Sequence, residues 1–280
     1  MLEHMPGAMR SIVRIALGVY ASLFAFAWFF SDAVIFQPRP PSYSDGPPYR
    51  KIPAPGGGFV AIRSLWNPKA RFTILFSHGN AEDLGDLEPS LRAYAAHGFS
   101  VVAYDYSGYG ASTGSPSEEA AYANILAVYE YLLREHGLPP ERIIAFGRSV
   151  GSGPGVELAI RKPVGGLILE SAFTSAFRVA TILPILPFDR FENIRKISSV
   201  RCPLLFIHGR RDGIVAFRHG ETLYDRAPSP KMRLWVDGAG HNDVMRTAGE
   251  AYWKALAEFE RCVSVYNPRT FGSQVTVQGR

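Results

Sequence analysis

The stretch that most constrains this chain is AFGRSVG, residues 145–151, in which Ser149 stands between two glycines. An apolar run typical of a short buried strand, 142–146, precedes it, and a stretch that favours a helix, 150–161, follows it. Strand, G-x-S-x-G and helix in this order predict a tight, strained turn that presents the Ser149 hydroxyl at the carboxyl end of the strand. A side chain at either flanking glycine would collide with the turn or the neighbouring strand. The same pattern also arises by chance in a chain with 27 glycines, so Ser149 needs partners elsewhere.

Predicted strands and helices alternate along the rest of the chain. The strands are short apolar runs, which are typical of a parallel sheet covered by helices on both faces. We expect further strands at 58–66, 71–76, 99–104, 164–169, 202–207 and 231–236, the first of them at the sheet edge, and further helices at 81–97, 117–136, 217–226 and 244–262. The sequence therefore predicts an α/β fold with a mostly parallel central sheet and helices on both faces. The interval from Glu170 to Cys202 has room for a small cap of one or two short helices.

A serine hydroxyl is a weak nucleophile at neutral pH and needs a base, usually a histidine oriented by a buried carboxylate. In parallel sheets such groups come from loops at the carboxyl ends of strands. His241 follows the last predicted strand, in the loop Gly-Ala-Gly-His-Asn-Asp, and Asp212 follows the strand before it. The chain order Ser149, Asp212, His241 is one in which catalytic triads occur. We predict Ser149 as the nucleophile, His241 as the base and Asp212 as the acid.

Five other side chains at strand ends are alternatives. Glu170 is a rival for the acid, although a helix cap or a satisfied structural carboxylate is the simpler interpretation. Asp243 is expected to anchor the loop of the predicted base, and Asp105 to hold backbone amides in its own turn. His78 and His208 each precede a glycine, and we expect them to pack beneath the site.

The negative charge that develops on a substrate oxygen needs two N–H donors, an oxyanion hole. One donor is expected to be the backbone N–H of Val150, the residue after the predicted nucleophile. The other is expected from the loop after the strand 71–76, where Asn80 or Ala81 is suitably placed.

Five ordered motifs give the chain a resemblance to a known family. They are His78-Gly79-Asn80, Asp105-Tyr106-Ser107-Gly108-Tyr109-Gly110, Gly147-x-Ser149-x-Gly151, His208-Gly209-x-x-Asp212 and Gly240-His241-Asn242-Asp243. Over residues 72–259 the chain resembles alpha/beta-hydrolases of the Bem46-like group, which includes hydrolase-domain proteins 13 and 17. The resemblance implies the alpha/beta-hydrolase fold, a serine-hydrolase activity and often one N-terminal membrane segment. Members of the 17 group carry an N-terminal cysteine cluster for lipidation and act as protein depalmitoylases, whereas no cysteine precedes Cys202 here.

We therefore expect a serine hydrolase that cleaves carboxylic ester or thioester bonds through an acyl-enzyme. Its substrate would be a small-molecule or lipid-like acyl ester, and we expect no cofactor and no metal, since no histidine forms an H-x-x-x-H pattern or lies beside a C-x-x-C. Two alternatives remain open. The same triad would also serve a peptidase or amidase, and a noncatalytic binding module with this fold would typically lack a triad member.

The N-terminal run 15–30 contains no charge and follows Arg10 and Arg14. A membrane-spanning helix needs about twenty apolar residues. Alternatives are a secretory signal peptide, with Ala25-Phe26-Ala27 as a possible cleavage site, and a buried core helix. Aromatic residues come directly after this possible cleavage site, and aromatic side chains are typical of a membrane interface. This favours an uncleaved anchor. The nearest positive charge beyond the run is Arg39. This weak bias of positive charge toward the amino end places the N-terminus in the cytoplasm and the catalytic domain outside.

These observations divide the chain of 280 residues into an anchor or signal segment, 1–38, a hydrolase domain, 39–263, and a loose C-terminal tail, 264–280. The net charge is +5, and the Lys and Arg residues are scattered rather than gathered in a basic helix or strand, so nucleic-acid binding has little support. Cys202 and Cys262 would pair in an oxidising compartment, although two isolated cysteines are more often buried and inert. The sequence does not indicate an oligomeric state.

Overall fold

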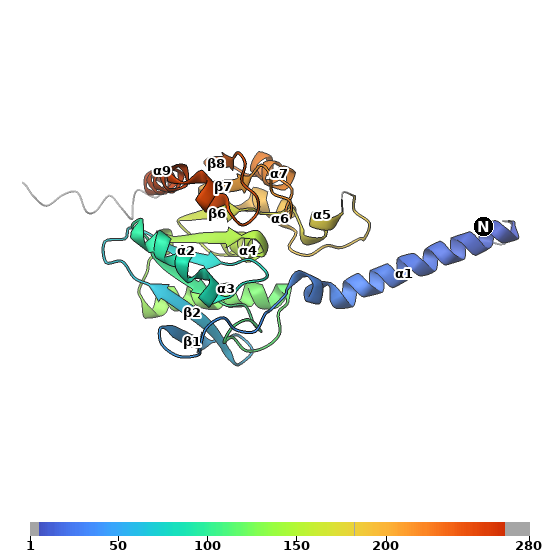
Figure 1. The fold of residues 1–280 in the computed structure, drawn as a ribbon, viewed down its shortest axis with the longest axis horizontal. Coiled ribbons are helices and arrows are strands. Elements are labelled where there is room, and N and C mark those ends of the chain that lie inside the picture. The colour runs from blue at the N-terminus through green and yellow to red at the C-terminus, as the bar shows by residue number, and fades with distance from the viewer. Residues whose placement is uncertain (1–5, 182, 267–280) are drawn as a thin grey trace, which may run out of the picture.

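A computed structural model describes residues 6–181 and 183–266 of the chain, in one domain from which an N-terminal helix projects (Figure 1). Residues 267–280, most of the segment predicted as a loose tail, lie outside this range. Cys202 and Cys262 are both free thiols. Burial raises the pKa of the Cys202 thiol to about 12, as expected of an inert cysteine.

A single eight-stranded sheet forms the centre of the domain, with strand order β1-β2-β4-β3-β5-β6-β7-β8 (Figure 1). β2 runs antiparallel to β1 and β4, and all pairs from β4 to β8 are parallel. The prediction of a mostly parallel sheet is therefore confirmed. The strands are β1 (Tyr49–Pro53), β2 (Phe59–Leu65), β3 (Thr73–Ser77), β4 (Ser100–Tyr104), β5 (Ile143–Arg148), β6 (Gly166–Glu170), β7 (Leu204–Gly209) and β8 (Lys231–Val236).

One strand prediction was wrong in its position. The segment 58–66 was expected at the sheet edge, but β2 lies between β1 and β4. The edge is β1, which forms inside the proline- and glycine-rich segment that precedes β2 and buries Ile52 against the core. A five-residue strand with one buried side chain leaves little periodicity to detect.

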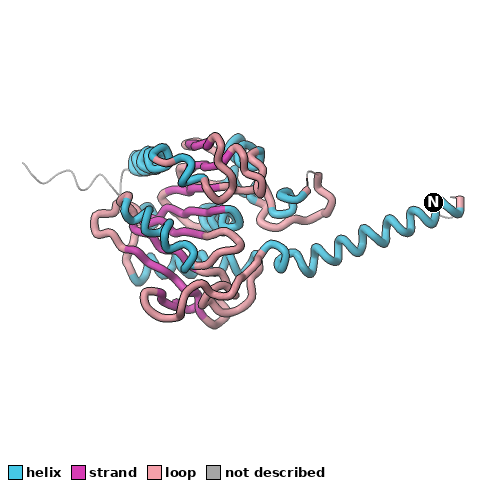
Figure 2. The backbone as a smooth tube through the Cα atoms, in the orientation of Figure 1, coloured by secondary structure: helices cyan, strands magenta, loops and turns pink. Residues whose placement is uncertain are grey.

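Helices cover both faces of the sheet (Figure 2). α3 (Glu118–Glu135) and α4 (Ser152–Arg161) pack with Val102 and Tyr104 of β4, whereas α2 (Leu84–Ala96) and α9 (Glu250–Tyr266) pack with Val101 and Ala103. The alternation along β4 thus sends successive side chains into two separate cores. The shorter helices are α5 (Ala176–Ala180), α6 (Asn193–Lys196), α7 (Arg218–Arg226) and α8 (Val244–Ala248), and three 3-10 turns cover Pro140–Arg142, Ser149–Gly151 and Ile197–Ser199.

The predicted last helix, 244–262, is in fact two helices. Gly249, with a φ of 53°, separates α8 from α9. This left-handed conformation ends one helix and redirects the chain at little cost only because the residue is glycine.

The segment between β6 and β7 forms the small cap that the sequence predicts. Among its described residues it contains only α5, α6 and one 3-10 turn. In Figure 1 the cap segment around α5 lies on the side of the domain from which the N-terminal helix projects.

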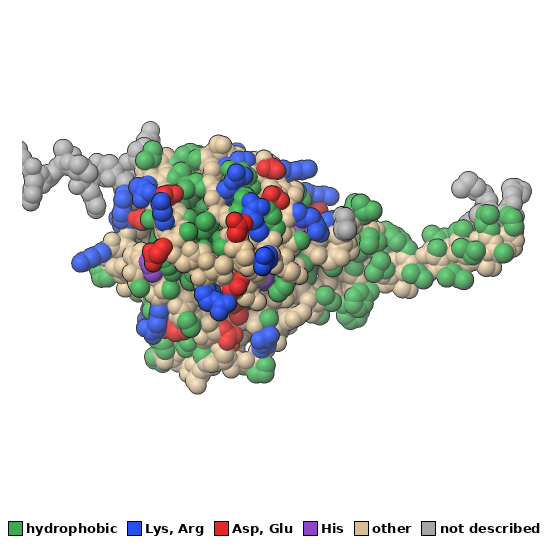
Figure 3. All heavy atoms as spheres, turned by 45° about the horizontal axis from the view of Figure 1, so that its top comes forward, with side chains coloured by type: hydrophobic (Ala, Val, Ile, Leu, Met, Phe, Trp, Pro, Cys, Tyr) green, Lys and Arg blue, Asp and Glu red, His purple; other side chains and the backbone are tan. Residues whose placement is uncertain are grey.

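The N-terminal helix, α1 (Gly7–Ile35), has 29 residues and is long and apolar enough to cross a membrane. Its most apolar window is not buried at all, which argues against a core helix, and hydrophobic side chains cover the projecting rod in Figure 3. A signal sequence would have the same length and composition. The helix joins the domain at Phe36, which is fully buried against the rings of Tyr106, Tyr109 and Phe191.

Candidate active site

Ser149 lies in the strained turn that the G-x-S-x-G pattern predicts. Its φ is 53°, a left-handed conformation that costs a non-glycine residue about 1–3 kcal/mol. A Cβ atom at Gly147 would overlap the carbonyl oxygen of Gly151, and one at Gly151 would overlap that of Ser77 on β3. The turn itself and the neighbouring strand therefore each require a glycine.

The three predicted triad residues meet at the carboxyl edge of the sheet, in the loops that follow β5, β7 and β8. His241 Nε2 lies 3.0 Å from Ser149 Oγ, and His241 Nδ1 lies 2.7 Å from Asp212 Oδ2. Both are hydrogen-bond distances. One imidazole thus bridges a hydroxyl and a carboxylate that are 63 residues apart in sequence, from 149 to 212.

Asp212 is held in its ionised form. Its Oδ1 accepts two backbone N–H groups, at 2.9 and 2.8 Å. Burial by itself would raise the pKa of the Asp212 carboxyl, but hydrogen bonds from His208 and His241 keep this pKa well below its usual range. A carboxylate at this place accepts the Nδ1 proton of His241, which leaves the Nε2 lone pair facing the Ser149 hydroxyl.

The rival carboxylates have structural partners. Glu170 is buried, its Oε2 accepts a 2.6 Å hydrogen bond from the Tyr252 hydroxyl, and burial raises the pKa of its carboxyl. Asp243 accepts a 2.7 Å bond from the backbone N–H of Gly240 and so anchors the loop of His241, as predicted.

The other rivals also lie in supporting positions. Asp105 accepts one backbone amide, that of Leu84 at 3.0 Å, and its second oxygen accepts the Tyr43 hydroxyl at 2.5 Å. His78 and His208 are both fully buried. His78 Nε2 lies 3.5 Å from Asp105, and His208 Nε2 lies 2.9 Å from a backbone carbonyl, so neither of these ring nitrogens is directed at Ser149.

The loop after β3 carries the two predicted alternatives for the second oxyanion donor. The Gly79 N–H is occupied, because it donates to Glu82 Oε1 at 2.6 Å. In the described part of the chain, the backbone N–H groups of Asn80 and Ala81 have no hydrogen-bond acceptor. Val150, the predicted first donor, is the second residue of the 3-10 turn that begins at Ser149. Asn80, Ala81 and Val150 therefore remain the candidates.

Two tyrosines of the Asp-Tyr-Ser-Gly-Tyr-Gly motif fix the carbonyl groups of this loop. The Tyr106 hydroxyl donates to the His78 carbonyl at 2.7 Å, and the Tyr109 hydroxyl donates to the Asn80 carbonyl at 2.6 Å. The Tyr109 oxygen also accepts the backbone N–H of Gln37 at 2.8 Å. The Asn80 side-chain amide in turn donates to the carbonyl of the last residue of α1 at 3.2 Å. The end of α1 is thus bonded directly to the candidate oxyanion loop.

Sequence reasoning missed these positioning residues and a further ion pair. Arg148, the residue before the candidate nucleophile, pairs with Glu82 of the oxyanion loop. Burial would raise the pKa of the Glu82 carboxyl, but Arg148 outweighs this and lowers it. For the two tyrosines, the available sequence signal was their Tyr-x-x-Tyr spacing in a motif that follows a strand. A charged residue inside G-x-S-x-G gives no sequence signal of an ion pair.

Comparisons with known proteins agree with this geometry. The chain is 42% identical over 201 residues to human alpha/beta hydrolase domain-containing protein 17B, a match that covers 71% of this chain and 68% of that protein. The chain belongs to the alpha/beta-hydrolase family. A family model described as "Serine aminopeptidase, S33" matches residues 68–187 of this hydrolase.

The match to a second curated relative covers less than two thirds of that relative's own length. Alpha/beta hydrolase domain-containing protein aho-3 of Caenorhabditis elegans is 46% identical over 71% of this chain, and the match covers 59% of its own length. Among solved structures, an esterase of Pyrococcus furiosus superposes with a TM-score of 0.66 at 18% identity, covering 80% of this chain and 98% of the esterase. A monoacylglycerol lipase of Paleococcus ferrophilus gives a TM-score of 0.56 at 19% identity, over 73% of this chain and 98% of the lipase. At these identities the two structures show the shared fold.

Proposed function

We propose that this hydrolase cleaves carboxylic ester or thioester bonds through an acyl-enzyme formed on Ser149. The observation that carries the proposal is the continuous hydrogen-bonded series from Ser149 through His241 to Asp212, with distances of 3.0 and 2.7 Å. The position of Ser149 on the strained turn at the carboxyl edge of the sheet, which is typical of a nucleophile, also supports the proposal.

In the proposed mechanism, His241 Nε2 removes the proton of the Ser149 hydroxyl as the oxygen attacks the acyl carbon. Asp212 fixes the tautomer and stabilises the imidazolium that forms. His241 then gives the proton to the leaving alcohol or thiol. A water molecule, deprotonated by the same imidazole, attacks the acyl-enzyme and releases the carboxylic acid.

The backbone N–H of Val150 and that of Asn80 or Ala81 would bind the negatively charged oxygen of each tetrahedral intermediate. Two features support this assignment. The Asn80 and Ala81 amides are free of other acceptors within the described residues, and Tyr109 and Glu82 hold the loop from either side.

A fluorophosphonate probe and a panel of 4-nitrophenyl esters test the proposal. The wild-type chain should be labelled and should hydrolyse the esters. Ser149→Ala should lose the label and at least about a thousandfold in kcat, and Ser199→Ala, an exposed serine elsewhere, should behave as wild type. Labelling and turnover that survive Ser149→Ala would overturn the proposal, and absence of both in the wild type would favour a noncatalytic binding module.

Amide hydrolysis is the second candidate, favoured by the description of the matching family model as a serine aminopeptidase. The same nucleophile and base serve both reactions, but an amine leaves only when it is protonated. Matched acyl esters, thioesters and anilides of one acid separate the two. We expect kcat/KM for the ester and thioester to exceed that for the anilide, and the reverse order would assign a peptidase.

We further propose that residues 1–38 form a membrane anchor for the hydrolase domain 39–263. The length and composition of α1 support this, and its most apolar window is exposed rather than buried in the domain. The orientation with the domain outside the cytoplasm stays a prediction from Arg10 and Arg14. Protease added to intact cells should remove the domain, and full protection would reverse the orientation.

A further inference from the structure

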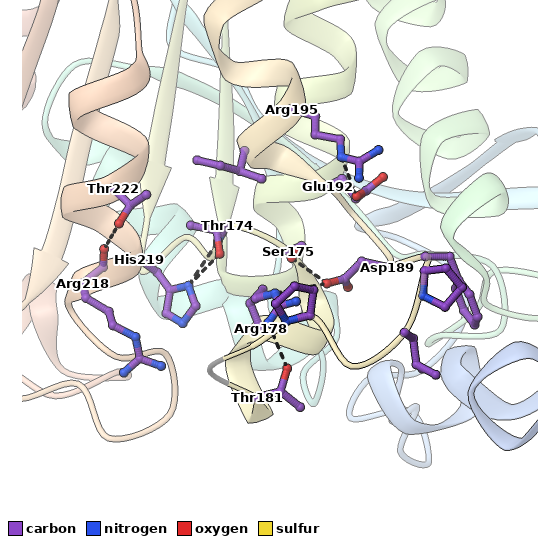
Figure 4. Close-up of a pocket in the computed structure, with 15 residues that line it drawn as sticks. Thr174, Ser175, Arg178, Thr181, Asp189, Glu192, Arg195, Arg218, His219 and Thr222 are labelled. Carbon is purple, nitrogen blue, oxygen red and sulfur yellow. Dashed lines mark hydrogen bonds and ion pairs between the residues drawn. The ribbon is translucent and has the colours of Figure 1, made fainter. Parts of the chain in front are cut away.

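Two cavities of opposite character adjoin where the cap approaches α1 and α7. The first, of about 410 Å³, lies between the cap and α7 and is lined largely by polar residues (Figure 4). The second, of about 290 Å³, lies between the cap and α1 and is lined mostly by apolar residues. They share part of their walls, namely Arg178, Thr181, Leu186, Phe188 and Asp189. None of the candidate triad residues lines either cavity.

The polar cavity carries an excess of positive charge. Arg178, Arg195 and Arg218 line it together with the carboxylates Asp189 and Glu192 (Figure 4). Glu192 pairs with Arg195 at 2.9 Å. Arg178 is 4.0 Å from Asp189, and no carboxylate lies within 4.0 Å of Arg218 among residues 6–181 and 183–266. Two guanidinium groups are thus weakly paired or unpaired.

Asp189 is not free to neutralise these arginines. Its oxygens accept the Ser175 hydroxyl at 2.7 Å and the backbone N–H groups of Phe177 and Arg190 at 2.8 and 2.7 Å. The carboxylate therefore organises the cap backbone. Arg178 and Arg218 remain suited to bind an anion, and guanidinium groups match the oxygens of a phosphate in particular.

His219 adds an unpaired donor at the same wall. It is 3% exposed, and its Nδ1 accepts from the Thr174 hydroxyl at 2.9 Å and, more weakly, from the Thr174 N–H at 3.4 Å. Burial first, and Arg218 second, lower the pKa of His219 to about 4, so the ring is neutral at pH 7 and carries its proton on Nε2. Nε2 has no hydrogen-bond partner in the described structure, although the backbone of Arg178 lies close enough to act weakly on the ring, so this buried donor is poorly satisfied.

The apolar cavity suits a hydrocarbon chain. α1 contributes Leu23, Phe26 and Ala27 to one wall, and the cap contributes Phe177 and Ile185 to the other. From Leu23 to the end of α1 this wall extends about 18 Å along the helix axis. Since the proposed membrane helix itself forms the wall, the cavity is continuous with the surface that would face lipid.

We propose that these cavities together bind an anionic phospholipid of the surrounding membrane, with the phosphate between Arg178 and Arg218 and one acyl chain along α1. The occupant follows from the charge of one cavity, the apolar lining of the other and their shared wall. This lipid is a bound partner rather than the substrate, because no candidate triad residue lines either cavity. The proposal therefore does not depend on the proposed ester hydrolysis.

The test uses the full chain with Ser149→Ala in a neutral detergent, so that turnover does not intervene. We expect palmitoyl-oleoyl phosphatidylglycerol to bind saturably by native mass spectrometry and to raise the Tm, because a ligand specific for the folded state stabilises it. Phosphatidylcholine with the same chains should bind at least about tenfold more weakly, because its choline cation offsets the phosphate charge beside the arginines. Glycerol 3-phosphate should also bind at least about tenfold more weakly, because it has no acyl chain for the apolar cavity.

Two pairs of variants localise the site. Arg218→Gln should weaken phosphatidylglycerol binding about tenfold, roughly the loss of one charge-assisted hydrogen bond, whereas Arg226→Gln, at the other exposed end of α7, should not. Ala27→Phe fills the apolar cavity and should weaken binding to a similar extent, whereas Ala25→Phe, on the exposed face of α1, should not.

Equal binding of the two phospholipids, equal binding by Arg218→Gln and Arg226→Gln, or binding of glycerol 3-phosphate as tight as that of the lipid would each overturn the proposal. Loss of binding in Ala25→Phe as well as Ala27→Phe would assign the lipid to the general detergent-exposed surface of α1 and would also overturn it. Ester hydrolysis, measured separately with Ser149 intact, reports on the proposed function alone.

Discussion

The candidate triad and the cap are neighbouring regions of one protein, yet they are built on different principles. The triad residues are fixed by the backbone: each follows a parallel strand, and the sheet register brings their loops to one edge. The cap has little regular structure, and α1 and α7 supply the other walls of its cavities. The sheet therefore determines where chemistry can occur, and the less regular cap region is where the identity of a bound molecule can be specified.

The contrast extends to electrostatics. Every carboxylate near Ser149 has close hydrogen-bond partners, including Asp212, Glu170 and Glu82. Near the cap, Arg218 and His219 Nε2 have no such partner in the described part of the chain. Satisfied groups make a rigid site, whereas unsatisfied groups at a cavity indicate a place for a ligand.

The largest effect that would test this contrast is expected from the acid of the candidate triad. Asp212→Asn should lower kcat about ten-thousandfold, because an amide favours the wrong tautomer of His241. Glu170→Gln should remain within a few-fold of wild type, since a glutamine oxygen can still accept the Tyr252 hydroxyl. Initial rates on a soluble ester measure both, and a circular dichroism melt checks the fold of each variant.

The opposite ranking would move the acid to Glu170. In that case Asp212 would only support the loop of His241. The acid would then come from the end of β6 rather than from the loop after β7.

The sheet edge was predictable for a physical reason. Ser149, Asp212 and His241 each follow an apolar strand, and loops after parallel strands must meet at one edge, so chain order alone placed them together. Glu170 ends such a strand, and its contacts distinguish it from the acid: it accepts the Tyr252 hydroxyl, 82 residues further on, whereas Asp212 binds His241. Contacts of that separation leave no local pattern in a sequence.

The cap region was predictable only in outline. Its small size followed from the interval between Glu170 and Cys202. From the sequence alone, a pocket wall and packing on the sheet are equally compatible roles for seven apolar cap residues: Phe173, Phe177, Val179, Ile182, Leu183, Ile185 and Leu186. In the structure Phe173 is buried in the core, Phe177 lines the apolar cavity and Leu183 is 71% exposed, while Ile182 lies outside the described residues. The position of Phe177 depends on α1, whose docking on the cap has no sequence signature.

Tyr109 connects the two regions, and its loss should have an intermediate effect. Tyr109→Phe removes the hydrogen bonds to Asn80 and to the backbone after α1 while it keeps the ring that packs on Phe36. We expect kcat to fall about tenfold, equivalent to about 1.4 kcal/mol, with KM nearly unchanged, because the oxyanion loop matters most in the transition state. Affinity for a trifluoromethyl ketone, which forms a tetrahedral oxyanion on the serine, should fall by the same factor.

Tyr129→Phe is the matched control, since this buried tyrosine also donates one 2.7 Å bond to a backbone carbonyl, at Pro163. Both variants should lose similar thermal stability, but only Tyr109→Phe should lose ketone affinity. Equal losses of kcat in the two variants would reduce Tyr109 to a general packing role.

The smallest effect is expected from His219, the buried histidine of α7. The pKa of His219 is lowered from 6.5 to about 4, so between these pH values the unfolded chain binds a proton that the folded chain excludes. Stability that depends on neutral His219 is therefore complete above pH 6.5 and is lost as the pH falls toward 4. Between pH 6.5 and 4, the fall in unfolding free energy should be smaller in His219→Gln by about 1 kcal/mol, or about 2–4 °C in Tm. Above pH 6.5, the Tm profiles of wild type and His219→Gln should run parallel. His136→Gln, which replaces an exposed histidine whose pKa is also lowered by partial burial and Arg50, should change the profile less. If wild type and His219→Gln lose Tm equally between pH 6.5 and 4, His219 is not held neutral, and the polar cavity would contain a fourth cation rather than a neutral donor.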